Sequence, residues 1–233
     1  MIFNGLEKLS LVDYDGKVAA TVFTGNCNFR CGFCHNGPLV TEADSLIEIP
    51  ESEILDYLIK RKGILEGLCI SGGEPTLKKD LPSFCEKVKK LGYSVKLDTN
   101  GTNPDMVKAL FENGLCDYFA MDIKNDKAGY SDIIGIKNYD LSKVEKTVDY
   151  FIGGDCDYEF RTTLISEFHK KNNIENMALW LKGAKKFFFQ KYKDSDNCIE
   201  HGFTEVPQKT AEEYLSVMKN TVKHAALRGY DID

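Results

Sequence analysis

Apolar and polar positions along the chain follow two alternating periods. Six short runs of apolar or β-branched residues predict β-strands, and turn residues or a helical pattern follow each of them. The predicted strands are residues 18–23, 67–71, 94–98, 118–122, 158–164 and 185–190. Successive strand–helix units imply parallel strands joined by right-handed crossovers. A closed barrel and an open, doubly wound sheet both fit this order, so the pattern alone leaves that choice open.

The segments between these strands have helical periodicity and recognisable helix boundaries. Asp80 can cap a helix that Gly92 ends, and Asn103 precedes a proline at the first helical position of a helix that ends at Gly114. Further helices are predicted over 52–62, 141–151, 174–181 and about 210–227. We therefore expect one α/β domain over 1–233, with a core at about 17–190 and a C-terminal helical extension at about 208–233.

Composition and charge narrow the class of protein. The 233 residues are 42% apolar, enough for a substantial core, and the net charge of −6 argues against general nucleic-acid binding. No apolar run approaches the roughly 18–20 residues of a membrane span, and the N-terminus lacks the pattern of a signal peptide. We expect a soluble, cytoplasmic protein that partners neither nucleic acid nor a membrane.

Three of the eight cysteines form a compact C-x3-C-x2-C loop, Cys27, Cys31 and Cys34, directly after the first predicted strand. Thiolates select zinc, copper(I) or iron–sulfur clusters, and three of them leave one iron of a [4Fe–4S] cluster open to a small molecule. The alternative is a structural zinc site with His35 as the fourth ligand. Adjacent Cys34 and His35 are poorly placed to bind one ion, and no second cysteine pair exists. The spacing thus favours the cluster.

The other five cysteines are scattered, and a disulfide framework is not expected without export signals. Free cysteine packs as a small hydrophobe. We expect this of Cys69, Cys85, Cys116, Cys156 and Cys198.

Polar residues cluster where the predicted strands end. In a parallel α/β barrel the active site lies at the carboxyl ends of the strands, and polar groups there are costly unless paired or liganded. Any one of them could form a structural ion pair, but together they predict a polar cavity that faces the cysteine loop. These residues are Gly72, Gly73, Glu74, Asp98, Asn100, Asp122, Lys124, Arg161, Thr163 and Gln190.

S-adenosylmethionine (SAM) fits such a cavity, because its amine and carboxylate can chelate the open iron. Charge and position suggest which residues hold each part of it. The amine suits Glu74 and the backbone of Gly72 and Gly73, and the carboxylate suits Lys124 or Arg161. The ribose hydroxyls can bond to Asp98, Asn100 or Gln190, and the adenine can lie against Phe33 and Thr163.

Three motifs carry a resemblance to the radical SAM superfamily. They are the cysteine loop with Phe33 before its last cysteine, Gly-Gly-Glu-Pro at 72–75, and Asp122-x-Lys124. The sequences at 34–36, 96–101, 120–124 and 158–163 resemble, more closely, the superfamily's glycyl-radical-enzyme activases. The resemblance implies a partial (β/α)6 barrel with one [4Fe–4S] cluster. It also implies reductive cleavage of SAM to a 5′-deoxyadenosyl radical, which takes a hydrogen from a glycine of a partner enzyme.

Within that group the chain is similar to proteins labelled anaerobic ribonucleoside-triphosphate reductase activating protein. The resemblance implies that reductase as partner and flavodoxin or ferredoxin as electron donor. Alternatives are activation of another glycyl radical enzyme such as pyruvate formate-lyase, a small-molecule reaction like that of 7-carboxy-7-deazaguanine synthase, or a zinc-stabilised binding protein. The segment 192–207 departs from the family pattern and receives no role from it.

Overall fold

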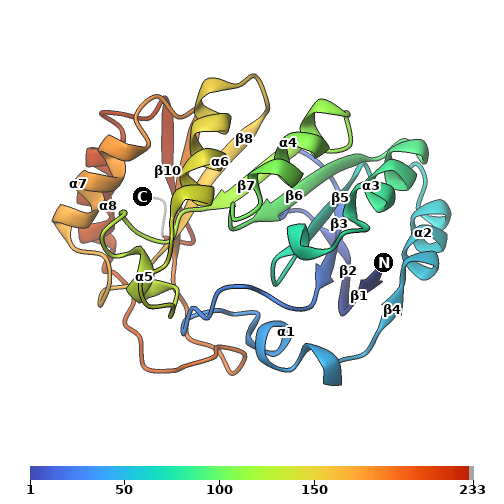
Figure 1. Cartoon of the computed structure of the whole chain (residues 1–233), viewed down its shortest axis with the longest axis horizontal. Coiled ribbons are helices and arrows are strands. Elements are labelled where there is room, and N and C mark those ends of the chain that lie inside the picture. The colour runs from blue at the N-terminus through green and yellow to red at the C-terminus, as the bar shows by residue number, and fades with distance from the viewer. Residues whose placement is uncertain (231–233) are drawn as a thin grey trace. The chain divides into compact units, whose positions relative to one another are not determined.

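The computed structural model describes residues 1–230 (Figure 1). The chain forms two compact units. The first contains Met1–Asn28 and Asn36–Ala120, and the second contains Phe29–His35 and the chain from Met121 onward. Strand β7 (Tyr118–Asp122) passes from the first unit into the second. The cysteine loop also crosses this boundary, between Asn28 and Phe29.

The first unit is an α/β unit in which β2 and β3 pair antiparallel and β3, β5 and β6 pair parallel, in the strand order β2-β3-β5-β6-β7. A two-stranded antiparallel ladder, β1 with β4, lies outside this sheet. The elements are β1 (Ile2–Phe3), β2 (Gly5–Ser10), β3 (Ala19–Thr24), α1 (Gly37–Thr41), β4 (Ile49–Pro50), α2 (Glu51–Lys60), β5 (Gly67–Gly72), α3 (Leu81–Lys90), β6 (Ser94–Thr99) and α4 (Pro104–Glu112), with 3₁₀ helices at Ala43–Ser45 and Pro75–Leu77.

Local signals explain where these helices begin and end. The side chain of Asn103 accepts a hydrogen bond from the Met106 amide (3.3 Å), which confirms the predicted N-cap of α4. Gly92 and Gly114 follow α3 and α4 with φ of 91° and 65°, left-handed values that glycine adopts without strain.

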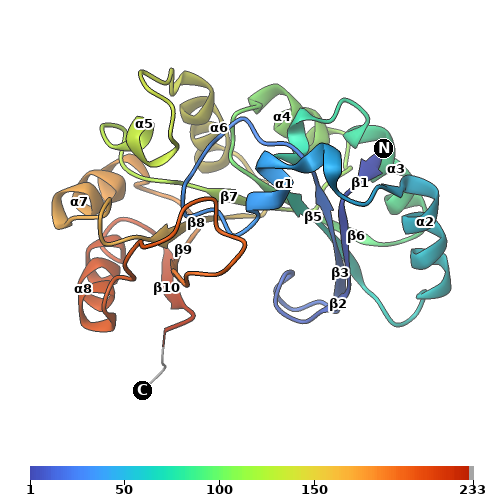
Figure 2. The ribbon, with the colours of Figure 1, turned by 90° about the horizontal axis from the view of Figure 1, so that it is seen from below.

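The second unit continues the α/β pattern with β8, β9 and β10 paired in parallel, in the order β7-β8-β9-β10. Helices α7 and α8 lie side by side in both views (Figure 1, Figure 2). The elements are α5 (Tyr130–Ile133), α6 (Ser142–Gly153), β8 (Tyr158–Leu164), α7 (Lys171–Trp180), β9 (Lys186–Lys191), α8 (Gln208–Met218) and β10 (His224–Arg228).

The C-terminal end corrects one prediction. The helix predicted over about 210–227 ends at Met218, and the remainder forms the turn 219–223 and strand β10. Ala225, Ala226 and Leu227 pair with successive phenylalanines of β9, so a short apolar run that suits either element becomes a strand through sheet pairing. The helical extension predicted to 233 is therefore wrong over β10, and 231–233 lie outside the described residues.

The N-terminal strands β1 and β2 were not among the predicted elements. None of the helices within residues 1–230 combines the length and apolar character that crossing a membrane requires.

All five scattered cysteines are buried and unbridged, as predicted. Burial raises the pKa of two of these thiols, Cys85 to about 12 and Cys156 to about 11, so neither is a reactive thiolate.

Candidate functional site

The two glycines after β5 bring that strand end against the chain that enters the cysteine loop. A Cβ on Gly73 would lie 2.0 Å from the Asn26 carbonyl oxygen, and one on Gly72 (φ 118°) would lie 2.4 Å from the Thr24 nitrogen. The Gly73 amide donates to Thr24 and the Glu74 amide donates to Asn26, both at 2.8 Å. The close approach that these glycines permit is therefore to the residues that precede Cys27.

Glu74 is completely buried and its carboxylate serves the protein itself. It accepts hydrogen bonds from the Thr76 hydroxyl and amide (3.1 Å to the amide), the Thr99 hydroxyl (2.8 Å) and the Asn100 amide (2.6 Å). Burial raises the pKa of Glu74, while these four donors favour the ionised carboxylate. The Glu74 oxygens thus join the loops after β5 and β6, and the predicted contact of Glu74 with the amine of a ligand stays a prediction.

Asn100 and Asp98, at the end of β6, also have partners within the first unit. The Asn100 side-chain amide lies 3.9 Å from the sulfur of Cys27, and its predicted contact with a ribose stays a prediction. Asp98 accepts from the Lys96 ammonium (2.9 Å) and the Ser71 hydroxyl (3.0 Å). The predicted contact of Asp98 with a ribose stays a prediction.

In the second unit, Asp122 lies between two cations. It accepts from Arg161 Nε at 3.0 Å and from Lys124 Nζ at 3.1 Å. Burial acts to lower the pKa of Lys124, but the charges of Asp122, Cys31 and Cys34 outweigh it and hold that pKa above its usual range. Two cationic side chains are thus held at one carboxylate, where they can pair with an anionic ligand group.

Lys124 also connects this charged group to the cysteine loop. Its ammonium lies 6.0 Å from the centroid of the Phe33 ring, a cation–π distance. Phe33 is buried and packs edge-on against Phe203, with ring centroids 6.4 Å apart. The structure thus gives Phe33 a packing role within its own unit, and its contact with adenine stays a prediction.

Sequence reasoning missed His169, which lies in the loop after β8. The ring is buried; Nδ1 accepts from the Ile165 amide and Nε2 donates to the Lys124 carbonyl, both at 2.9 Å. Burial lowers its pKa to about 4, so the ring is neutral near pH 7 and the Nε2 proton stays available to Lys124. Its position after a strand end was the available signal, but nothing in the pattern identified Lys124 as its partner.

The segment 192–207, to which the sequence assigned no role, covers the cysteine loop in the second unit. The Glu200 amide donates to the Gly32 carbonyl at 2.8 Å, and the Cys198 thiol lies 3.8 Å from the Phe33 carbonyl. A Cβ on Gly32 would lie 2.8 Å from Glu200 Oε2. Backbone and thiol contacts of this segment therefore determine the shape of the loop between Cys31 and Cys34. His35 Nε2 bonds the Lys193 carbonyl at 2.5 Å, so that nitrogen is engaged elsewhere than at a metal.

Two further predicted residues lie level on neighbouring strands. Thr163 of β8 is the register partner of Gln190 of β9, which in turn pairs with Arg228 of β10. The Arg228 guanidinium binds both oxygens of buried Glu159 at 2.7 and 2.9 Å. The strand ends of this unit are polar as predicted, but the SAM contacts of Thr163 and Gln190 stay predictions.

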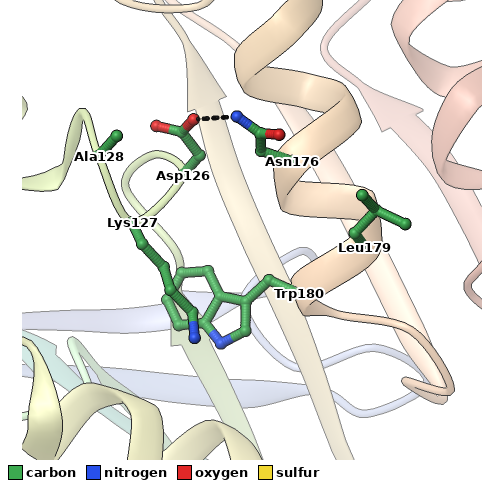
Figure 3. Close-up of a pocket in the computed structure, with 6 residues that line it drawn as sticks. All are labelled: Asp126, Lys127, Ala128, Asn176, Leu179 and Trp180. Carbon is green, nitrogen blue, oxygen red and sulfur yellow. Dashed lines mark hydrogen bonds between the residues drawn. The ribbon is translucent and has the colours of Figure 1, made fainter.

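A hollow of about 340 Å³ lies in the second unit, and none of the predicted residues lines it (Figure 3). Asn176 donates to Asp126 across it at 2.9 Å, and the Lys127 ammonium lies 5.3 Å from the Trp180 ring centroid. Its lining is Asp126, Lys127, Ala128, Asn176, Leu179 and Trp180. It contains no cysteine and no residue that the sequence assigned to a site.

An iron–sulfur cluster requires thiolate ligands, and donors near their sulfurs tune it. Within residues 1–230, no group of three or more His, Cys, Asp or Glu side chains is gathered so as to hold a metal ion, and the three cysteines divide between the two units. In each unit the donors nonetheless suit ligating thiolates: an amide N–H₂ faces Cys27 at 3.9 Å, and the Lys124 ammonium lies 6.0 Å from the ring centroid of Phe33, the residue before Cys34. The residues therefore fit such a group by their chemistry.

A family model supplies the decisive comparison. The model of the radical SAM superfamily matches residues 21–178. The chain belongs to the radical SAM superfamily. It is accordingly an enzyme of a family that uses a [4Fe–4S] cluster and SAM, and the matched residues include parts of both units.

Individual relatives of this radical SAM enzyme cover most of the chain. A Methanocaldococcus jannaschii protein provisionally named glycyl-radical enzyme activating enzyme is 29% identical over 96% of this chain and 92% of its own. The 7-carboxy-7-deazaguanine synthase of Thermoplasma acidophilum is 27% identical over 72% of this chain and 76% of its own.

Solved structures are similar in fold. The crystal structure of Streptococcus suis SuiB bound to the precursor peptide SuiA has a TM-score of 0.71 and 14% identity, over 90% of this chain and 48% of SuiB. These likenesses and the family match confirm the predicted α/β fold of the radical SAM type with mostly parallel strands.

Proposed function

We propose that this chain is an activating enzyme that generates a glycyl radical on a partner enzyme, with Cys27, Cys31 and Cys34 as the ligands of its cluster. The observation that carries the proposal is the position of Lys124, whose ammonium lies 3.1 Å from Asp122 and 6.0 Å from the ring centroid of Phe33 in the cysteine loop. A cation there joins a cluster-binding loop to a site for an anionic group. Similarity over nearly the whole chain to the M. jannaschii protein supports the choice of reaction.

The chain's own residues bind and orient the cofactors. A cluster held by Cys27, Cys31 and Cys34 would supply the one electron for cleavage of SAM to methionine and a 5′-deoxyadenosyl radical, and that radical would take a hydrogen from a glycine of the partner. Lys124 or Arg161 pairs with the SAM carboxylate, and Glu74 and the backbone at Gly72 and Gly73 bind its amine. Asp98, Asn100 or Gln190 binds the ribose, and Phe33 and Thr163 border the adenine.

No side chain has to transfer a proton in this reaction, so the protein contributes positioning, cluster tuning and exclusion of water. The segment 192–207 suits the last of these, because it covers the loop around Gly32 and Phe33. The finer assignments of the proposal are a cytoplasmic location, anaerobic ribonucleoside-triphosphate reductase as the partner, and flavodoxin or ferredoxin as the electron donor.

The test is anaerobic. The purified chain should bind about four irons and four sulfides, and with SAM, dithionite and the partner it should produce the EPR doublet of a glycyl radical. Alanine variants of Cys27, Cys31 or Cys34 should lose both the bound iron and sulfide and the EPR doublet of the glycyl radical. Cys85→Ala is the matched control, since Cys85 is a buried cysteine of α3 that should ligate nothing. One zinc and no iron in the wild-type chain would refute the proposal.

A second candidate reaction is that of 7-carboxy-7-deazaguanine synthase, favoured by the T. acidophilum relative, which also matches most of this chain. The same preparation distinguishes the two. Formation of 7-carboxy-7-deazaguanine without a partner protein, and no glycyl radical with any candidate partner, would favour the synthase.

A further inference from the structure

Three side chains beside Cys27 form a closed ring of hydrogen bonds. Asn100 Nδ2 donates to Asn28 Oδ1 at 2.8 Å, Asn28 Nδ2 donates to Thr102 Oγ1 at 2.9 Å, and the Thr102 hydroxyl donates to Asn100 Oδ1 at 2.7 Å. Asn28 directly follows Cys27, and the other two residues lie in the loop after β6. The ring therefore joins the start of the cysteine loop to the loop after β6, and Asn28 and Asn100 are 72 residues apart in the sequence.

This ring leaves only one orientation for the Asn100 amide. Its oxygen receives both the Thr102 hydroxyl and the Thr102 amide, at 2.7 and 3.1 Å. Rotating the amide by 180° would set its N–H₂ group against these two donors and its oxygen against the oxygen of Asn28. The Asn100 N–H₂ group consequently faces Asn28 and, at 3.9 Å, the sulfur of Cys27.

The main chain at Asn100 is held equally firmly. Its amide donates to buried Glu74 at 2.6 Å, and the preceding Thr99 hydroxyl donates to the same carboxylate at 2.8 Å. Asn100 itself is 6% exposed. The buried carboxylate of Glu74 thus positions the backbone of Asn100, and the ring of hydrogen bonds positions its side chain, whose N–H₂ group faces Cys27.

We propose that Asn100 donates a hydrogen bond to the Cys27 sulfur when that sulfur ligates the cluster, and so raises the reduction potential of the cluster. The inference rests on the proposed function. Hydrogen bonds to ligating sulfurs are among the factors that set the potential of an iron–sulfur cluster. Reduction adds negative charge, part of which resides on the sulfurs, and an N–H dipole that points at a sulfur stabilises that charge. Asn100 is on this argument a positioning and tuning residue, which need not contact SAM.

The test measures the midpoint potential of the reconstituted cluster by EPR-monitored redox titration, without SAM or partner. Asn100→Leu removes the donor at similar volume. It should shift the equilibrium between oxidised and reduced cluster about tenfold toward the oxidised form, which is about 59 mV for one electron. Thr102→Val leaves Asn100 in place but removes the hydroxyl that orients its amide, and should shift the potential less, in the same direction.

Asn103→Leu is the matched control. Asn103 lies in the same loop, donates to the Thr76 carbonyl at 2.9 Å and caps α4 by accepting from the Met106 amide, so this variant also loses hydrogen bonds, but none to Cys27. Its cluster should keep the wild-type potential. The inference is overturned if Asn100→Leu and Thr102→Val bind four irons at the wild-type potential, or if Asn103→Leu shifts the potential equally. A wild-type chain without a cluster would instead refute the proposed function.

Discussion

Replacing Gly73 by alanine tests how closely the end of β5 must approach the cysteine loop. The added Cβ would lie 2.0 Å from the Asn26 carbonyl oxygen, whereas real Cβ contacts are at least 3.0 Å. The backbone at Asn26 would have to move by about 1 Å, and Cys27 is the next residue along the chain. Overpacking of this kind costs about 1–3 kcal/mol, and misplacement by about 1 Å can lower a reaction rate about 10²-fold.

The assay for Gly73→Ala combines three measurements under anaerobic conditions. Chemical denaturation gives the change in the free energy of unfolding, iron and sulfide analysis gives cluster content, and single-turnover SAM cleavage gives the rate. We expect a loss of about 2 kcal/mol, reduced iron content and a SAM cleavage rate about 10²-fold lower.

Gly153→Ala is the control for this substitution. It lies at the end of α6, and a Cβ there meets no atom within 4 Å. That variant should be as stable as the wild type or more stable by about 0.4–1 kcal/mol. A Gly73→Ala protein with wild-type stability, iron content and rate would refute the idea that this contact places Cys27.

Three further predictions concern the polar side chains Glu74, Lys124 and His169. Glu74→Gln should lower the free energy of unfolding by about 2–3 kcal/mol in denaturant titrations. In one orientation the N–H₂ group of the new amide faces the Asn100 amide, and in the other it faces the donors of Thr76 and Thr99. A loss below about 0.5 kcal/mol would contradict this prediction. Lys124→Met should weaken SAM binding at least about tenfold (~1.4 kcal/mol) in equilibrium binding to the reconstituted protein, whereas Lys127→Met should not, and equal affinities would remove Lys124 from the SAM site. The pKa of the His169 ring is about 4 in the folded protein and about 6.5 in the unfolded chain, so only the unfolded chain gains a proton between these values. The free energy of unfolding should therefore be highest above pH 6.5 and fall by up to about 3 kcal/mol as the pH drops to 4. His169→Gln should be less stable at pH 7 but lack this part of the pH dependence, and an unchanged slope would argue against a buried neutral ring.

Several features of the enzyme can be predicted from local sequence alone. The spacing of Cys27, Cys31 and Cys34 indicates soft-metal chemistry without knowledge of any distant residue, because a ligand motif is a property of a few consecutive positions. The strand periodicity and the cap at Asn103 are similarly local, and the parallel order of the sheet follows from the succession of strand–helix units.

Other features depend on residues that the fold brings together from distant parts of the chain. The sequence does not show whether an acidic or amide side chain at a strand end faces a ligand or another part of the protein. The tertiary structure decides that Glu74 holds the loops after β5 and β6, that Asn100 faces Cys27 through Asn28 and Thr102, and that His169 holds Lys124. It decides equally that residues 224–228 form a strand, because pairing with β9 satisfies their backbone groups. The physical reason is the same in each case: a buried polar group requires a partner, and that partner is supplied by an element elsewhere in the sequence.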